Sequence, residues 1–308
     1  MTNPDRLVIS ASRRTDIPAF YMPAFMKAID RGAFEVENPY NRRISRVPSS
    51  PERVYAVVFW SKNFGPFLNG GFGEKLQARG YRLFFNFTVN TGLPPLEPNI
   101  PPIEHRLDQL AELCRRFGPE TINWRFDPIC HWREDGRHTA SGTANNLATF
   151  SQIADRAAGL GIQRCITSFV DRYPKVRRRA AAAGGIRFED PSLPVKRGIV
   201  LKMNSALQST GIRLMLCCEK EVLDGLTPES GISHGACISG HLLQEIFGGE
   251  APLRPDRGQR RAAGCRCTVS ADVGSYRNHP CAHACLYCYG NPTRHAGQAG
   301  HGEGGGSG

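Results

Sequence analysis

The chain has 308 residues, of which 40% are hydrophobic, so it is long enough to bury the core of one large domain or two small ones. It opens without an apolar signal core and has no run of about eighteen apolar residues, which argues against a secreted disulfide scaffold and against a membrane protein. We therefore expect a cytoplasmic protein without a membrane partner, in which the clustered members of its 11 cysteines bind metal.

The formal net charge of +11 favours a polyanionic partner such as nucleic acid, because an excess of positive charge attracts negatively charged molecules. The basic residues are scattered in short runs, at residues 42–43, 115–116, 177–179 and 260–261. A solvated basic surface is the simpler interpretation of such a scatter.

Short apolar, β-branched or aromatic runs recur at long intervals and predict strands at residues 7–12, 54–60, 83–89, 121–126, 165–170, 212–217 and 268–273. Several are continuously apolar, as parallel strands buried on both faces are. Helical patterns lie between them, at residues 22–29, 103–117 and 147–157. This alternation predicts right-handed βαβ units and an α/β fold with a parallel sheet. Seven strands without an evident dinucleotide loop favour a single TIM-like barrel, complete or partial.

We expect the barrel body to occupy residues 1–250 and the last strand with a cysteine-rich segment to occupy residues 251–292. A basic stretch near residues 172–197, broken by Pro174, Pro191 and Pro194, reads as an insertion or a lid. The glycine-rich tail, residues 293–308, is predicted to be disordered.

The chemistry of such barrels lies on the loops that follow the strands. The first predicted strand leads into Arg13, Arg14 and Asp16, the second into Lys62, and the fourth ends at Asp127. Each of these side chains could serve as a cap or form a salt bridge. Their placement on one face of the barrel instead predicts a shared pocket, with Lys62 and Asp127 as candidate catalytic residues.

The most specific motif lies near the end of the chain, where Cys281, Cys285 and Cys288 read C-A-H-A-C-L-Y-C. Three thiolates on one loop hold three irons of a [4Fe–4S] cluster and leave the fourth iron open. S-adenosylmethionine chelates such an iron, and one electron then splits its sulfonium bond and releases a 5′-deoxyadenosyl radical. The aromatic Tyr287 before the third cysteine is typical of these radical enzymes. A zinc knuckle is the alternative, although structural zinc sites favour paired short spacings with four ligands.

A second group of cysteines lies upstream, at Cys217, Cys218, Cys237, Cys265 and Cys267. Four thiolates from this group would complete a second, closed cluster. A zinc site and unligated core thiols are the alternatives.

The chain resembles the domain-of-unknown-function family 1848, a bacterial and archaeal family with a radical S-adenosylmethionine-like cysteine motif at its C-terminus. The resemblance extends from about Leu7 to Pro292, and its blocks are residues 9–21, 58–63, 124–129, 234–238, 265–267, 272–276 and 281–291. Arg266 and Gly290 depart from the residues common in the family, and neither is a predicted ligand. The resemblance gives no substrate.

This resemblance implies that Cys217, Cys237, Cys265 and Cys267 form the auxiliary metal site, because they match the family's other recurrent cysteines. The resemblance implies that the ligand is Cys217 and not Cys218, because the family's segment reads Cys-x-Glu and residues 217–219 read Cys-Cys-Glu. The expected cofactors are therefore a [4Fe–4S] cluster and S-adenosylmethionine, with a possible second iron–sulfur cluster at the auxiliary site. We expect Tyr287 to face the adenine side of the pocket.

Ordinary radical S-adenosylmethionine enzymes carry the cluster loop after the first barrel strand, whereas here it follows the last. The last strand of a barrel lies beside the first, so the chain looks like a circularly permuted version of that fold. The usual glycine-rich cofactor motif is replaced by the loop that holds Arg13, Arg14 and Asp16. We interpret one of these arginines as the partner of the methionine carboxylate and Asp16 as an acceptor for its ammonium group. A structural ion pair is the alternative.

The sequence thus predicts a radical enzyme with an unknown substrate and an external one-electron donor of flavodoxin or ferredoxin type. One alternative is the same chemistry applied to nucleic acid, in repair or modification. The other is a non-catalytic iron–sulfur or zinc-binding protein.

Overall fold

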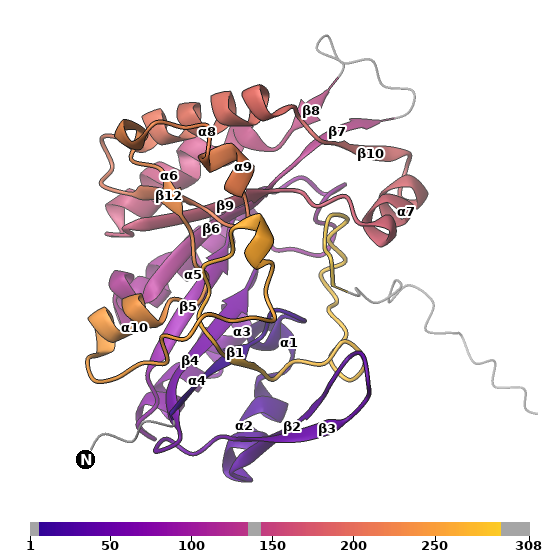
Figure 1. Ribbon diagram of the computed structural model, residues 1–308. Coiled ribbons are helices and arrows are strands. Elements are labelled where there is room, and N and C mark those ends of the chain that lie inside the picture. The colour runs from indigo at the N-terminus through magenta and orange to yellow at the C-terminus, as the bar shows by residue number, and fades with distance from the viewer. Residues whose placement is uncertain (1–5, 135–142, 291–308) are drawn as a thin grey trace, which may run out of the picture.

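The computed structural model describes residues 6–134 and 143–290. Its central element within these ranges is an eight-stranded sheet with the strand order β12-β11-β9-β6-β5-β4-β1-β13 (Figure 1). All pairings in this sheet are parallel. The strands are β1 (Leu7–Ala11), β4 (Val54–Ser61), β5 (Leu83–Thr88), β6 (Ile122–Ile129), β9 (Arg164–Phe169), β11 (Arg213–Leu216), β12 (Ser233–His234) and β13 (Ala271–Asp272).

The predicted α/β class with a parallel sheet is confirmed, and each of the seven predicted strands corresponds to a strand of this sheet. The eighth, β12, was not predicted. Its two residues are too few to form an apolar run that sequence periodicity can detect.

The first and last strands of the sheet in chain order, β1 and β13, lie side by side at one edge. Ile9 pairs with Ala271 and Ser10 with Asp272, so β13 lies parallel to β1 as predicted. At the opposite edge, the loop after β12 is tied to the segment before β13, because the Thr268 amide donates to the Ile238 carbonyl at 2.9 Å. The two edges of the sheet are therefore linked through loops.

One face of the sheet packs against helices and forms the main core. Phe59 of β4 and Phe85 of β5 stack at a centroid distance of 6.0 Å, and Phe67 and Phe117 from two covering helices contact Phe85. The helices are α1 (Ile17–Phe20), α2 (Met22–Asp30), α3 (Gly65–Asn69), α4 (Phe72–Gln77), α5 (Ile103–Phe117), α6 (Phe150–Gly159), α7 (Pro174–Ala182), α8 (Leu193–Leu207), α9 (Lys220–Leu223) and α10 (Gly240–Phe247). Helices α2, α5 and α6 correspond to the three predicted helical patterns.

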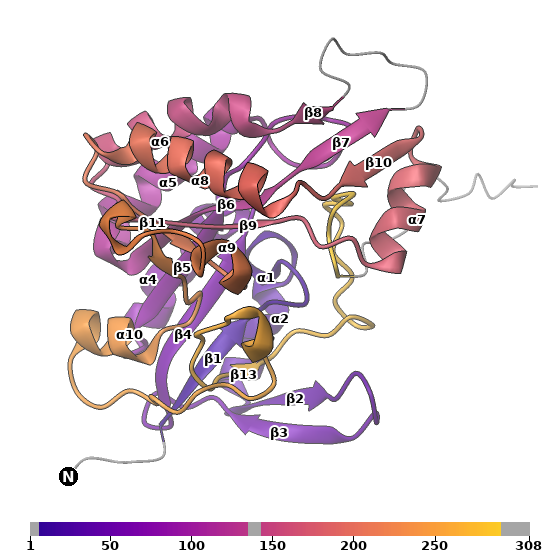
Figure 2. The ribbon, with the colours of Figure 1, turned by 45° about the horizontal axis from the view of Figure 1, so that its top comes forward.

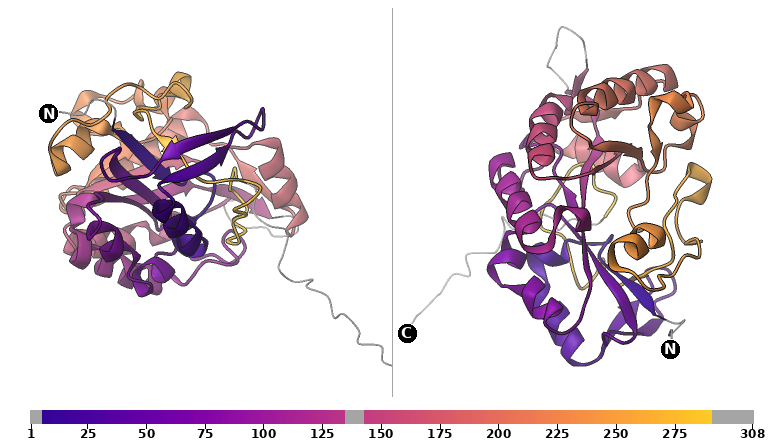
Figure 3. Two further views of the ribbon diagram at one scale, coloured as in Figure 1. Left: turned by 90° about the horizontal axis from the view of Figure 1, so that it is seen from below. Right: turned by 90° about the vertical axis from the view of Figure 1, so that its left-hand side faces the viewer.

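The other face of the sheet is covered only in part. Val58 and Phe84 pack there with Ile238 and with Leu243 of α10. The right-hand view of Figure 3 shows the resulting layers, with a row of helices on one side of the sheet and the orange segment with α10 on the other. Farther along this second face, towards the carboxyl ends of the strands, the packing is replaced by buried cysteines around Ile166.

Smaller sheets flank the main one. Strands β2 (Ala33–Glu37) and β3 (Ile44–Pro48) form an antiparallel hairpin, and β7 (His131–Glu134) pairs with both β8 (Ala144–Asn145) and β10 (Ile186–Glu189). The stretch predicted as an insertion or lid consists of α7, β10 and the start of α8. The predicted tail, residues 293–308, lies outside the described residues. Among those described, no helix has the length and apolarity needed to cross a membrane.

Candidate functional site

A cavity of about 460 Å³ lies at the carboxyl ends of the parallel strands. Its walls include residues that follow or end β1, β4, β6, β9, β11 and β13. Every site residue predicted from the sequence lines it: Arg13, Arg14, Asp16, Lys62, Asp127, Cys217, Cys237, Cys265, Cys267, Cys281, Cys285, Tyr287 and Cys288. The fold thus brings together side chains that are up to 275 positions apart in the sequence, since parallel strands all end at the same edge.

The segment after β13 carries the three cysteines of the C-terminal motif. Ala284 adopts a left-handed backbone conformation with φ 56°, which turns the chain between Cys281 and Cys285. The Gly290 amide donates a hydrogen bond of 3.2 Å to Cys288 Sγ. Burial, together with the nearby Asp16 carboxylate, raises the pKa of the Cys281 thiol to about 12. Thiols of this kind ionise when they bind a metal cation.

Arg179 of α7 fixes this segment from outside. Its Nη1 donates to the carbonyls of Cys285, Leu286 and Cys288 at 3.0, 3.0 and 2.8 Å. Its Nη2 lies 3.4 Å from the Gly290 carbonyl. The Arg179 guanidinium therefore donates to several carbonyl oxygens of the cysteine loop, and these hydrogen bonds hold the loop against α7 (Figure 2).

His283, between the first two cysteines of the motif, connects the cysteine loop to α1 and its N-cap residue. Its Nε2 lies 2.7 Å from Asp16 Oδ2, and its ring packs on Phe20. The other oxygen of Asp16 accepts the Ala19 amide and caps α1. Oδ2 also accepts from the Ser61 hydroxyl and the Lys62 amide, both at 2.9 Å. Both oxygens of Asp16 are thus occupied, and the geometry gives this residue the role of joining three segments.

A buried polar network lies behind Tyr287. Lys62 Nζ donates to Glu97 Oε1 at 2.7 Å and to Asn90 Oδ1 at 3.0 Å, and the Tyr287 hydroxyl also donates to Glu97. Arg106 approaches the second oxygen of Glu97 at 3.4 Å. The side chains of Glu97 and Arg106 are both fully buried. Burial opposes ionisation of Glu97, but the charges of Lys62 and Arg106 outweigh it and lower the pKa of this carboxyl.

The second group of cysteines forms a continuous set of thiol contacts. Cys217 Sγ lies 3.8 Å from Cys218 Sγ and 3.7 Å from Cys237 Sγ. Cys267 contacts Cys237 and Cys265, and Cys265 contacts Cys218. Hydrogen bonds from Cys237 and Cys265, and the charge of Arg13, lower the pKa of the Cys267 thiol. All four predicted auxiliary cysteines therefore meet, and Cys218 joins them as a fifth sulfur.

Two guanidinium groups lie beside these thiols, and both are close to the ring of Trp60. Arg125 lies 4.8 Å and Arg13 lies 5.2 Å from the Trp60 ring centroid. Arg125 Nη1 donates to Cys237 Sγ at 2.6 Å, and its Nη2 donates to Asp127, which also accepts from the Ser168 hydroxyl. Arg13 Nη2 is buried and has no hydrogen-bond partner among the described residues. This corner of the cavity therefore suits an anionic group.

Arg14 has different hydrogen-bond partners from Arg13. Its Nη1 donates to the Gly274 carbonyl at 3.0 Å, and its Nε is 3.9 Å from Asp272 Oδ1. The Asp272 carboxylate also accepts from the Ser12 hydroxyl at 2.6 Å and from the Arg13 amide at 2.7 Å. A single carboxylate on β13 thus shapes the loop that presents both arginines.

The family model described as Domain of unknown function (DUF1848) matches residues 8–290. The chain belongs to this family. A search of curated proteins found no match. The cavity of this DUF1848 protein is formed entirely by residues within the matched range.

The residues of the DUF1848 protein fit an iron–sulfur cluster by their chemistry. None of its cysteines forms a disulfide, and soft thiolate ligands select iron–sulfur clusters, zinc and copper(I). In the two described ranges, no group of three or more His, Cys, Asp or Glu side chains has the arrangement that would hold a metal ion. A single ion draws its ligands around one point, whereas a four-iron cluster keeps its thiolates apart across a larger inorganic core. The amide donor to Cys288 and the unpartnered Arg13 Nη2 both favour an anionic cluster nearby.

Several residues of this site in the DUF1848 protein were not predicted from the sequence. Glu97 lies in a proline-rich loop with no periodic pattern, and Arg179 belongs to a run that was interpreted only as positive charge. His283 and Trp60 lie inside motifs in which only other residues, such as Cys281 and Lys62, were predicted to have a function. The position of His283 between two cysteines of the motif was the one signal that could have been used, because the chain itself places such a residue beside them.

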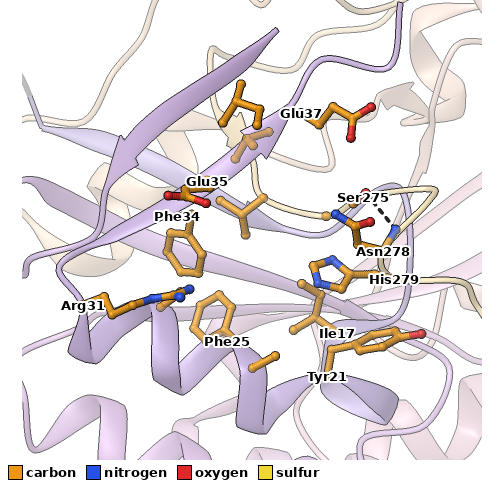
Figure 4. Close-up of a pocket in the computed structure, with 16 residues that line it drawn as sticks. Ile17, Tyr21, Phe25, Arg31, Phe34, Glu35, Glu37, Ser275, Asn278 and His279 are labelled. Atoms are coloured by element: carbon orange, nitrogen blue, oxygen red, sulfur yellow. Dashed lines mark hydrogen bonds between the residues drawn. The ribbon is translucent and has the colours of Figure 1, made fainter. Parts of the chain in front are cut away.

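The DUF1848 protein also has a second, smaller cavity of about 230 Å³, which shares no lining residue with the first. Figure 4 shows Arg31 and Phe34 on one side of it and Asn278 and His279 on the other. It lies between α2, the β2–β3 hairpin and the segment before the cysteine motif. No cysteine lines this cavity, and none of the predicted site residues does.

Proposed function

We propose that this protein is a radical S-adenosylmethionine enzyme whose [4Fe–4S] cluster is held by Cys281, Cys285 and Cys288. The observation that carries the proposal is that these three cysteines share one cavity with the charged loops at the carboxyl ends of the parallel strands. When bound, the cluster supplies one electron, received from an external flavodoxin- or ferredoxin-type donor, which cleaves S-adenosylmethionine into methionine and a 5′-deoxyadenosyl radical.

The chain's own residues supply binding and orientation. Arg179 and the Gly290 amide hold the cysteine loop in place. Arg14 is the better partner for the methionine carboxylate, because its guanidinium lines the cavity with 21% of its side chain exposed and has donors beyond the one used on Gly274. Arg13 is turned towards the auxiliary cysteines and is assigned to them. Asp16 holds its own loop and the cysteine loop together. Because both of its oxygens already accept hydrogen bonds, the ammonium group of S-adenosylmethionine is assigned to another acceptor.

The auxiliary site is proposed to hold a second iron–sulfur cluster on Cys217, Cys237, Cys265 and Cys267. Arg13 and Arg125 would offset its negative charge, since both lie beside these sulfurs. Cys218 lies close enough to Cys217 to replace it as a ligand. The site's proposed roles are to relay electrons and to stiffen the segment before β13.

The proposed fold is a circularly permuted and nearly closed version of the radical S-adenosylmethionine barrel. Three features support it: β13 lies parallel to β1, the cysteine loop follows β13, and the Thr268–Ile238 hydrogen bond links the two sheet edges. In an unpermuted chain the same loop would follow the first strand.

The proposal is tested by anaerobic reconstitution with iron and sulfide, followed by chromatographic detection of 5′-deoxyadenosine after addition of dithionite and S-adenosylmethionine. We expect product from the wild-type protein and none from Cys285→Ala. Cys114→Ala is the matched control, because Cys114 is a buried thiol of α5 outside the cavity, and it should retain the activity. Product formation by Cys285→Ala would refute the proposal. Stoichiometric iron without any cleavage would favour the non-catalytic alternative.

A further inference from the structure

Helix α7 and the cavity mouth together form an unusual surface. The sequence of α7 is P-K-V-R-R-R-A-A-A, with four cationic residues and no acidic one. Val176 and Ala180 are buried, and Arg179 points to the cysteine loop. The remaining face presents Arg177 and Arg178 to solvent. Among the described residues, neither of these two side chains forms an ion pair or a hydrogen bond, so their charges are available to a partner.

The positive charge continues around the mouth of the cavity. Lys175 lies 5.9 Å from the ring centroid of Tyr276, which lines the cavity. Arg277, the next residue, is exposed. The carboxylates on this rim are already neutralised, because Asp171 pairs with Arg260 at 2.7 Å and Asp190 with Arg172 and Lys196 at 3.4 and 2.7 Å. The uncompensated charge on the rim is therefore positive.

Aromatic rings are interleaved with these charges. Tyr173, immediately before α7, is 38% exposed, and Tyr289, at the end of the cysteine loop, is 46% exposed. Both line the cavity together with Tyr276. Aromatic side chains next to a positively charged groove are the usual platform for unpaired bases, because every base offers a π-face for stacking.

We propose that the substrate of this site is a single-stranded or locally unpaired nucleic acid, whose phosphates contact α7 and whose target base enters the cavity between Tyr173 and Tyr289. This inference rests on the proposed radical chemistry for its reaction, but the binding surface stands on its own observations. The cysteine loop lies inside the cavity, with Cys285 only 4% exposed, so a base stacked within a duplex could not reach it. The net charge of +11 agrees with a polyanionic partner.

The test is fluorescence anisotropy with labelled oligonucleotides of about 16 nucleotides, as single-stranded RNA, single-stranded DNA and a DNA duplex, across a range of salt concentrations. We expect either single strand to bind more tightly than the duplex. Arg177→Gln/Arg178→Gln should weaken binding about tenfold or more at low salt and reduce the slope of log affinity against log salt by about 1.4, because about 0.7 is lost per phosphate contact on a single strand. Tyr289→Leu should weaken binding about tenfold by removing a stacking surface.

The matched control is Arg53→Gln/Arg213→Gln. Both arginines are exposed, and they lie immediately before β4 and at the start of β11, at the amino ends of the strands and opposite the cavity. This variant removes the same charge and should bind as the wild type does. Equal losses in both double variants, unchanged binding in the α7 variant, or equal affinity for duplex and single strand would overturn the proposal.

A second measurement, the cleavage of S-adenosylmethionine in the absence of nucleic acid, tests the proposed function separately from the proposed substrate. The α7 variant should cleave the cofactor at the wild-type rate, because the side chains of these two arginines are exposed and neither residue lines the cavity. Wild-type protein that binds single strands but never cleaves the cofactor would refute the proposed function and leave the binding surface standing. Cleavage without oligonucleotide binding would refute the substrate class alone.

Discussion

At the scale of single residues, the buried Glu97 carboxylate offers the sharpest stability test. Glu97→Gln would leave Lys62 and the fully buried Arg106 without their shared negative partner. We expect the free energy of unfolding to fall by about 3–5 kcal/mol, as when one member of a buried ion pair is removed. Denaturant unfolding measures this directly. Glu112→Gln, at a partly exposed carboxylate of α5 that pairs with Arg115 on the helix surface, is the control and should change the stability much less, because ion pairs on the surface contribute little.

The same variant predicts a pH dependence. The pKa of Glu97 is lowered in the folded protein, so its contribution is fully present above the unfolded pKa of about 4.3 and is lost as the pH falls towards the folded value. The stability difference between wild type and Glu97→Gln should therefore be constant above about pH 5 and shrink below about pH 4. A difference that grew on acidification would contradict this assignment of charge.

Sequence reasoning at this scale found the residues that carry a local pattern. The spacing of Cys281, Cys285 and Cys288 and the loops after predicted strands all led to one cavity. Glu97 and Arg179 could not be found in this way, because each acquires its role from partners distant in the chain. Long-range pairing of this kind follows from packing, which leaves no trace in local periodicity.

At the scale of elements, α7 is predicted to hold the cysteine loop through Arg179. Arg179→Gln removes the guanidinium that bridges the carbonyls of Cys285, Leu286 and Cys288. We expect a loss of about 3 kcal/mol in stability, since hydrogen bonds to a charged group are the strong ones. We also expect the reconstituted protein to lose iron during gel filtration. Melting temperature and iron content after the column are the measurements.

Arg178→Gln is the matched control for that experiment, because Arg178 lies on the same helix but points to solvent. It should retain the iron and the melting temperature of the wild type. If Arg179→Gln behaves like this control in both measurements, α7 does not support the loop, and its contacts there contribute no stability.

Buried helices and strands were predicted from the sequence, whereas exposed or very short ones were not. The continuous apolar runs of β4 and β5 and the amphipathic face of α5 gave strong signals, and these elements form the main core. The β2–β3 hairpin was missed because β3 is largely exposed and has no apolar alternation. Strands β7, β8 and β10 are short, and no local pattern marks them. They are stabilised by pairing with each other: His131 of β7 pairs with Asn145 of β8, 14 positions away, and with Glu189 of β10, 58 positions away.

At the scale of the whole molecule, the pairing of the first strand, β1, with the last, β13, is the feature on which the proposed permuted fold depends. The pairing of Ser10 with Asp272 places the C-terminal cysteine loop beside the loop that holds Arg13 and Arg14. This neighbourhood was predicted from the position of the motif after the last strand. The sequence could not specify how the sheet edges are joined, because the Thr268–Ile238 contact depends on the course of irregular loops.

In the proposed function, Cys281, Cys285 and Cys288 hold a cluster with one iron open to S-adenosylmethionine. Electron paramagnetic resonance of the reduced, reconstituted protein, recorded with and without S-adenosylmethionine, tests it most directly. The experiment is best performed on a variant in which Cys265 and Cys267 are replaced by alanine, so that only one cluster contributes. We predict a [4Fe–4S]⁺ signal whose g-values change when S-adenosylmethionine is added. A cluster signal that is identical with and without S-adenosylmethionine would contradict the account.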